Sequence, residues 1–361
     1  MEIYASAPEP GTPPEAGLTR RERKQRRRAQ RRDRKRVSRR RLLLLLPLVA
    51  LVAGLSFFFL DPLDEDPVHR AQTPVVEPRL DLPDAADAGR GGTTFVGVSR
   101  NAGGGLSGGE KGALRRDLQG IARAYPGRYG VVVFDPSSDQ TVSMDPDGRF
   151  LAASLNKLPV LMTLYRSAAA GEVDLNDEIS MRASDVQAYG TGSLYTKPIG
   201  HTMTLRECAE YLIKESDNTA WKMLDRYLGR DVIRSELYSA GARSTEYWMP
   251  NTTTPNDVLV MLEKISDPSY TTPGLSDEML DVMTNTVFED RLPQSLPNDA
   301  RVSHKIGSYG ATFGDAGIVF PHGSKDDAYY IVVLVDETGE GTARAAMREM
   351  SRAAYRTIAD R

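Results

Sequence analysis

Hydrophobic and polar positions divide the chain into four stretches. Residues 1–41 are polar and strongly basic, and residues 42–60 form an apolar run without a charged side chain. Residues 61–106 are rich in Pro, Asp and Gly and show little apolar periodicity, which predicts a flexible linker. Over residues 107–361 apolar positions recur at helix or strand spacing, so we expect the folded domain there.

The folded domain is expected to begin with a helix and a β-hairpin. Ser107 and Glu110 have the spacing of a capping box, and apolar residues follow at helical spacing until Pro126. Short apolar runs over residues 130–134 and 141–144 then flank a turn rich in Asp, Pro and Ser. This arrangement predicts two antiparallel strands.

The remainder of the domain alternates in type. Residues 150–290 are mostly helical in pattern, whereas residues 302–308, 316–320 and 328–335 have the composition of strands. A last helix is expected over residues 342–360, where small and apolar side chains form one stripe. Strands at both ends of a helical middle predict one sheet built from distant segments, with an inserted all-helical subdomain.

Composition excludes a globally disordered chain and a disulfide framework. Hydrophobic residues make up 40% of the 361 residues and charged residues 26%, which is normal for a chain that buries a core. A single cysteine, Cys208, cannot form an intramolecular disulfide. The four histidines show no paired metal-ligand spacing, so we expect neither a metal nor a cofactor.

Charge is distributed asymmetrically. The chain has a net charge of -3, yet its first 41 residues carry 15 basic and 5 acidic side chains. As a helix, residues 42–60 would span roughly 28 Å, close to the thickness of a bilayer core. Because basic residues stay on the cytoplasmic side, we expect a single-span anchor with the N-terminus in the cytoplasm and the domain outside the membrane.

The same segments allow other interpretations. A cleaved signal peptide is less favoured, because no small-x-small cleavage site follows Leu60 and no lipobox cysteine is present. The basic tail could bind nucleic acid, but beside an apolar span anionic lipid headgroups are the simpler partner. We therefore expect no nucleic-acid function, and the sequence leaves any protein partner unknown.

Ser154 and Lys157 begin an apolar helical stretch. At positions i and i+3 of a helix their side chains share a face within reach of each other. A serine hydroxyl is a poor nucleophile unless a neighbour takes its proton, and a lysine can do so if burial and a second cation lower its pKa. Alone, the pair means little, because a serine that begins a helix is usually just an N-cap.

Two further motifs occur downstream. Ser216-Asp217-Asn218 separates two expected helices, a place where these residue types also serve as helix caps. Lys305-x-Gly307 lies on an expected strand, where the glycine either permits close approach of a ligand or marks a bulge.

In this order, S-x-x-K, S-D-N and K-x-G resemble the signature elements of the penicillin-recognising serine enzymes, which include class A β-lactamases and penicillin-binding proteins. Residues 252–255 resemble the stretch after the Ω loop of class A enzymes, and residues 304–308 and 315–319 resemble two of their strands. From residue 107 onward the chain resembles a class A β-lactamase-like domain. The resemblance implies an α+β fold of three layers, α/β/α, with an antiparallel sheet.

The resemblance also implies roles for the motif residues. Ser154 would attack an acyl carbonyl to form an acyl-enzyme, and Lys157 would accept its proton with Lys305 as the second cation. Ser216 would relay a proton to the leaving nitrogen. Asn218 would hold the substrate amide and the lysine.

Strand residues complete the expected site. Backbone N–H groups of Ser154 and Ser308 would stabilise the oxyanion. Asn218, Gly307 and Ser308 would bind the substrate. Ile306 replaces the Thr or Ser of the family motif and removes a hydroxyl that helps bind the substrate carboxylate, which the Ser308 side chain could replace in part.

The expected deacylation residue is missing. Class A enzymes carry a glutamate in an E-x-x-L-N motif on the Ω loop, and residues 239–251 lack that motif. Glu246 is the only carboxylate of this stretch, and Glu236 lies just before it. Both are weak candidates, because a surface carboxylate is the default interpretation of each.

The sequence therefore predicts an anchored extracytoplasmic serine hydrolase that is acylated by β-lactams or by a peptidoglycan stem peptide. Two alternatives stay open. The first is a true β-lactamase that positions water by another group. The second is a catalytically weak module that binds cell-wall fragments or acts as a receptor.

Overall fold

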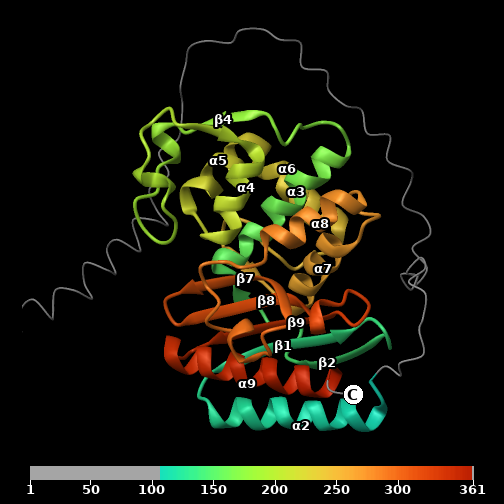
Figure 1. Cartoon of the computed structure of the whole chain (residues 1–361). Helices are drawn as coiled ribbons and strands as arrows, with labels where there is room; N and C mark the ends of the chain where they lie inside the picture. The colour runs from blue at the N-terminus through green and yellow to red at the C-terminus, as the bar shows by residue number, and fades with distance from the viewer. Residues whose placement is uncertain (1–105, 360–361) are drawn as a thin grey trace, which may run out of the picture. The chain divides into compact units, whose positions relative to one another are not determined.

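The computed structural model describes residues 106–359 (Figure 1). The helices are α2 (Gly108–Ala124), α3 (Lys157–Ala169), α4 (Leu205–Lys214), α5 (Asn218–Leu228), α6 (Arg230–Ala240), α7 (Pro255–Ser266), α8 (Pro273–Val282) and α9 (Glu340–Ile358). The strands are β1 (Arg128–Asp135), β2 (Gln140–Met144), β3 (Phe150–Leu151), β4 (Glu178–Ser180), β5 (Thr202–Thr204), β6 (Thr252–Thr253), β7 (Arg301–Tyr309), β8 (Thr312–Phe320) and β9 (Tyr329–Asp336).

One antiparallel sheet organises the domain. Its five strands lie in the order β2-β1-β9-β8-β7, and every neighbouring pair is antiparallel. The hairpin from the start of the domain thus joins three strands from its end, as the sequence predicts. Strand β7 forms one edge of the sheet.

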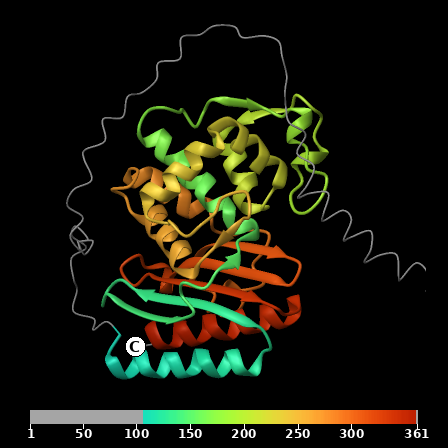
Figure 2. The ribbon, with the colours of Figure 1, turned by 180° about the vertical axis from the view of Figure 1, so that it is seen from behind.

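Side chains alternate between the two faces of the sheet, and each face belongs to a separate hydrophobic core. Val131 and Val133 pack with α2 and α9, whereas Val132 and Phe134 pack with the helices of the chain's middle. In Figures 1 and 2, α2 and α9 cover one face of the sheet, and the helical subdomain with α3 to α8 lies on the other side. This is the three-layer α/β/α architecture expected from the resemblance.

Helix α3 is the centre of the helical subdomain. Most of its side chains are buried, and α5, α6, α7 and α8 contact it. The middle of the chain is not entirely helical, however. Two-stranded ribbons, β3 with β6 and β4 with β5, lie within it, and strands of two or three residues are too short to show a period in sequence.

Local signals placed several elements correctly. Ser107 and Glu110 form the predicted capping box, and β1 and β2 form the predicted hairpin. Strand β8 begins at Thr312 rather than near residue 316, because Asp315 is accommodated inside the sheet. The predicted tail, span and linker lie outside the described residues, and within residues 106–359 no helix is long and apolar enough to cross a bilayer.

Candidate active site

Ser154 lies in a short 3₁₀ turn, η2 (Ala153–Asn156), directly before α3. The predicted helix therefore starts three residues later than the sequence suggests, at Lys157. Ala153 has a φ of 48°, an uncommon value for a residue with a side chain. The turn still brings the two motif side chains together, and Lys157 Nζ lies 3.2 Å from Ser154 Oγ.

Lys157 is the hub of the site. Its amine lies 2.6 Å from the backbone oxygen of Ser216, 3.2 Å from Ser216 Oγ and 2.7 Å from Asn218 Oδ1. The two shortest contacts involve carbonyl oxygens, which can only accept hydrogen bonds. A neutral amine can satisfy both with its two N–H groups, which leaves its lone pair available to the hydroxyl of Ser154 or Ser216.

Burial favours the neutral form of the Lys157 amine. It lowers the pKa of Lys157 to about 7, against an opposing effect of the Asp217 charge. Burial also lowers the pKa of Lys305 far below its ordinary value, and repulsion from Lys157 adds to this shift. The expected effect of a second cation thus lowers the pKa of Lys305, whereas burial is the cause of the lowered pKa of Lys157. A base with a pKa near neutrality is well matched to accept a proton from serine.

The S-D-N turn is held under strain. Ser216 has a φ of 53°, in the left-handed region that side chains disfavour. Next to it, the Asp217 carboxylate caps α5 by accepting the N–H groups of Thr219 and Ala220, and it also accepts the N–H of Leu194 at 2.8 Å. These bonds fix the turn that points Ser216 and Asn218 toward Lys157.

Asn218 connects the lysine to the neighbouring loop. Its Oδ1 accepts from Lys157, and its Nδ2 donates to the backbone oxygen of Tyr189 at 3.2 Å. Thr191 in the same loop donates its hydroxyl to the backbone oxygen of Ser216 at 2.6 Å. The predicted contact between Asn218 and the lysine is therefore present.

Strand β7 forms the opposite wall. A Cβ on Gly307 would lie 2.7 Å from the backbone oxygen of Ala152, so only glycine allows the strand to approach the η2 turn this closely. Lys305 is buried on this strand and donates to the backbone oxygen of Ile306. Ser308 follows Gly307, which brings its backbone near the turn that carries Ser154.

A comparison with protein families agrees with this geometry. Residues 113–358 match the family model of the β-lactamase enzyme family. The chain belongs to this family. It is thus a serine hydrolase of the β-lactamase type.

Individual relatives are distant. The chain is 25% identical over 242 residues to a β-lactamase of Bacillus licheniformis, covering 62% of this chain and 76% of that protein. It is 23% identical to β-lactamase VEB-1 of Pseudomonas aeruginosa, covering 63% of this chain and 83% of that one.

Solved structures show the same fold. PBP-A superposes with a TM-score of 0.64 at 27% identity, covering 69% of this chain and 97% of its own. A variant of PBP-A with the same score has been solved as an acyl-enzyme complex with penicillin G. The ancestral class A β-lactamase GNCA gives a TM-score of 0.62 at 25% identity, covering 66% of this chain and 98% of its own.

The structure adds one residue that sequence reasoning missed in this β-lactamase-like site. Arg291 is 2% exposed, and its Nη1 donates to the backbone oxygens of Gly307 at 3.0 Å and Gly314 at 2.6 Å. Its Nη2 donates to Ser308 Oγ at 2.5 Å. A lone arginine in a loop carries no local signal, because only the fold brings it to β7.

The guanidinium of Arg291 lacks a close carboxylate partner within the described residues. Its nearest is Asp290, 3.8 Å from Nε, and Asp290 forms a shorter ion pair with Arg344 at 2.8 Å. Burial lowers the pKa of Arg291, but an arginine stays charged at physiological pH. A positive group therefore lies next to Ser308 on β7.

Neither weak deacylation candidate contacts the nucleophile. Glu246 pairs with Arg149 at 2.8 Å and its side chain is 45% exposed, and Glu236 accepts a hydrogen bond from the hydroxyl of Tyr270. Within the described residues, neither carboxylate is hydrogen-bonded to Ser154 or Lys157. The structure thus places both side chains in other interactions.

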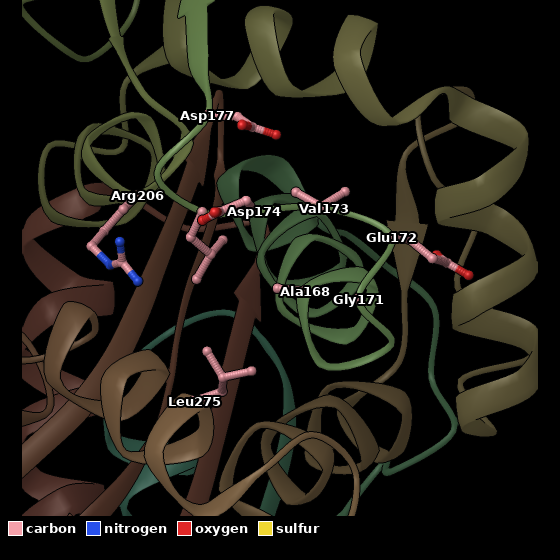
Figure 3. Close-up of a pocket in the computed structure, with 9 residues that line it drawn as sticks. Ala168, Gly171, Glu172, Val173, Asp174, Asp177, Arg206 and Leu275 are labelled. Atoms are coloured by element: carbon pink, nitrogen blue, oxygen red, sulfur yellow. The ribbon is translucent and has the colours of Figure 1, made fainter.

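The surface hollow shown in Figure 3 is separate from these residues. It lies at the C-terminal end of α3, and Arg206 and the carboxylates of Glu172, Asp174 and Asp177 are among its lining groups. None of the motif residues lines it. The candidate active site is therefore defined by the convergence of side chains around Lys157.

Proposed function

We propose that this β-lactamase-family protein forms an acyl-enzyme on Ser154 with β-lactams or with D-Ala-type peptides of peptidoglycan. The observation that carries the proposal is the position of the Lys157 amine, which lies within hydrogen-bond distance of the hydroxyls of Ser154 and Ser216. An amine with a pKa of about 7 at this point can accept the serine proton.

Acylation would proceed in two steps. Ser154 Oγ bonds to the substrate carbonyl carbon as its proton passes to Lys157, and backbone N–H groups of Ser154 and Ser308 stabilise the oxyanion. The C–N bond then breaks, and Ser216 donates a proton to the leaving nitrogen while it takes one from Lys157. The product is an ester on Ser154.

Recognition of a carboxylate is assigned to the β7 edge. β-Lactams and D-Ala peptides both carry a carboxylate beside the reacting amide. Arg291 supplies a buried guanidinium next to Ser308, and the Ser308 hydroxyl already accepts from it. This pair replaces the hydroxyl that Ile306 lacks.

The fate of the ester separates the remaining alternatives. Because Glu246 and Glu236 are engaged elsewhere, we expect the acyl-enzyme to persist longer than in an efficient β-lactamase. Rapid turnover of nitrocefin would instead favour a β-lactamase that positions water by another group.

Labelled penicillin and mass spectrometry test the proposal. The wild-type protein should gain one adduct on Ser154, and Ser154→Ala should gain none. Ser235→Ala is a matched control, because Ser235 is an exposed serine on α6 and should not affect labelling. Absence of an adduct, together with no turnover of β-lactam or D-Ala-D-Ala peptide, would favour the binding module.

We also propose the location of the enzyme. The basic residues 1–41 and the apolar residues 42–60 support a single-span anchor that leaves the catalytic domain outside the cytoplasm, where peptidoglycan lies. Anionic lipids would bind the basic tail. Protease treatment of intact cells tests this topology, since only an external domain would be digested.

A further inference from the structure

A buried histidine lies between two carboxylates next to the active-site strand. His304 is on β7 and fully buried, and its Nδ1 lies 2.8 Å from Oδ1 of Asp315 on β8. Its Nε2 lies 3.2 Å from Oε1 of Glu289, which comes from the loop before β7. The acylation steps use none of these three residues.

The two carboxylates hold both sides of one segment, residues 286–292. On one side, Glu289 bonds to His304 and also accepts the N–H and hydroxyl of Thr286. On the other side, Asp315 Oδ2 accepts the N–H of Leu292 at 3.0 Å. Arg291 lies between these two attachments.

The ionic character of the cluster follows from its composition. Burial lowers the pKa of His304, but the charges and hydrogen bonds of Asp315 and Glu289 outweigh it and raise the pKa to about 9. The histidine is then cationic at neutral pH and can donate from both ring nitrogens. A doubly donating imidazolium can hold two carboxylates at once.

We propose that His304, Asp315 and Glu289 form an ionic latch that fixes residues 286–292 against the edge of the sheet and thereby positions Arg291 for the substrate carboxylate. These are positioning residues, because they touch neither the substrate nor the reacting atoms. The inference rests on the proposed acylation of carboxylate-bearing substrates.

The latch acts by fixing the position of Arg291 relative to β7 and β8. Arg291 bonds to β7 and β8 through two backbone oxygens and one hydroxyl, and these bonds require its backbone to stay at one distance from the strands. Glu289 and Asp315 set that distance from both sides. Loosening one side lets the guanidinium move away from Ser308 while the Ser154 and Lys157 pair is left in place.

Two substrates and three variants test the latch. Acylation of Ser154 is measured with a penicillin and with its methyl ester, which lacks the carboxylate. Glu289→Gln removes the charge but keeps the shape of a side chain that is 42% exposed, so the fold should survive. The matched control is Glu278→Gln, which removes a carboxylate that is 28% exposed from an ion pair with Arg206.

The expected result is selective. Glu289→Gln should reduce acylation efficiency toward the penicillin at least about tenfold, through a higher KM, and leave the ester within about twofold of wild type. Glu289→Asp should recover part of the loss, and Glu278→Gln should affect both substrates alike. An equal loss for both substrates, or no loss for either, would overturn the proposal.

Hydrogen exchange tests the latch independently of activity. Glu289→Gln should accelerate exchange at the Leu292 amide, which bonds to Asp315 and not to Glu289. If wild-type protein is acylated by neither substrate, the proposed function fails, and the exchange result still decides whether the segment is latched. Unchanged exchange at Leu292 would refute the latch even if the enzyme is active.

Discussion

Lys157 combines two features that a general base needs. Its burial favours the neutral amine, and two carbonyl oxygens accept hydrogen bonds from that amine, which leaves the lone pair of a neutral amine available to a hydroxyl. A lysine at the surface would have neither property. If Ser154 is the nucleophile, as proposed, its activation depends on the burial of the first residue of α3.

The first prediction concerns pH. With a pKa of about 7, Lys157 is protonated below pH 7 and neutral above it, so the acylation rate should rise with pH through 7 and then level off. Below the pKa, the rate should change about tenfold per pH unit. Acylation rates measured with labelled penicillin from about pH 5 to about pH 9 check this.

Lys157→Arg is the companion variant. An arginine keeps the positive charge but does not lose its proton, so acylation should fall at least about 100-fold at every pH. A wild-type rate that is independent of pH would show that another group takes the serine proton.

Gly307 gives a second prediction. Gly307→Ala would place a methyl group 2.7 Å from the backbone oxygen of Ala152, and either the strand or the η2 turn must move. We expect a loss of about 1–3 kcal/mol in the free energy of unfolding. Acylation should fall at least about tenfold, because the turn carries Ser154.

Gly120→Ala is the control for this variant. Gly120 lies in α2, and a Cβ there meets no atom within 4 Å. Alanine should stabilise the helix by about 0.5–1 kcal/mol without changing acylation. Thermal unfolding measures the stability of both variants, and penicillin labelling measures their acylation. An active Gly307→Ala enzyme would show that the site does not need β7 to lie this close to the η2 turn.

The site could be predicted from sequence where its residues occur in motifs. Ser154, Lys157 and the S-D-N turn share short spacings, and the structure brings them into contact. Arg291 and His304 could not be assigned in this way. Their partners come from other segments, so only the pairing of β7 with β8 and the path of residues 286–292 bring them together.

The turn between α4 and α5 shows how secondary structure positions the site. Helix α4 ends at Lys214, α5 begins at Asn218, and Ser216 and Asn218 of the S-D-N motif lie at this junction. Asp217 is the helix cap that the sequence allows, and its neighbours Ser216 and Asn218 contact Lys157. The helix cap and the contacts with Lys157 thus share one turn.

Asp217→Ala tests this coupling. The variant loses two capping bonds and the bond to Leu194, which should cost about 2 kcal/mol of stability. Acylation should also fall at least about tenfold, because the strained conformation of Ser216 loses its support. Urea unfolding and labelling with penicillin measure the two effects.

Thr272→Ala is the matched control for capping. Thr272 caps α8 through the N–H of Leu275, away from the S-D-N turn. Its loss should cost about 1 kcal/mol and leave acylation unchanged. Equal activity in Asp217→Ala and Thr272→Ala would show that the turn needs no carboxylate to hold Ser216.

Elements with strong periodic patterns were predictable, and short or polar ones were not. The capping box set the start of α2, and the apolar run of β9 identified the central strand. Strand β8 was predicted too short, because its buried carboxylate resembles a turn residue until its histidine partner is known. From sequence alone the η2 turn is indistinguishable from the start of α3, since both conformations bring positions i and i+3 together.

The order of segments along the chain explains why one sheet can hold a large helical insertion. Strands β1 and β9 pair along their length, so the first and last strands of the domain support each other. Helices α2 and α9, also from the two ends, pack on the same face. The site then forms where the insertion returns to the edge strand β7.

The pairing of the first and last elements also predicts that the domain folds and reacts without the first 91 residues. The two cores lie within residues 106–359, and the first described residue, Leu106, is buried and donates its N–H to Asp135. A chain that begins at Gly92 should fold, be acylated by penicillin at the wild-type rate and occur in the soluble fraction of cells. The full chain should occur in the membrane fraction, because only it contains residues 42–60. A soluble full chain would refute the anchor, whereas an inactive shortened chain would show that the domain needs its N-terminal residues.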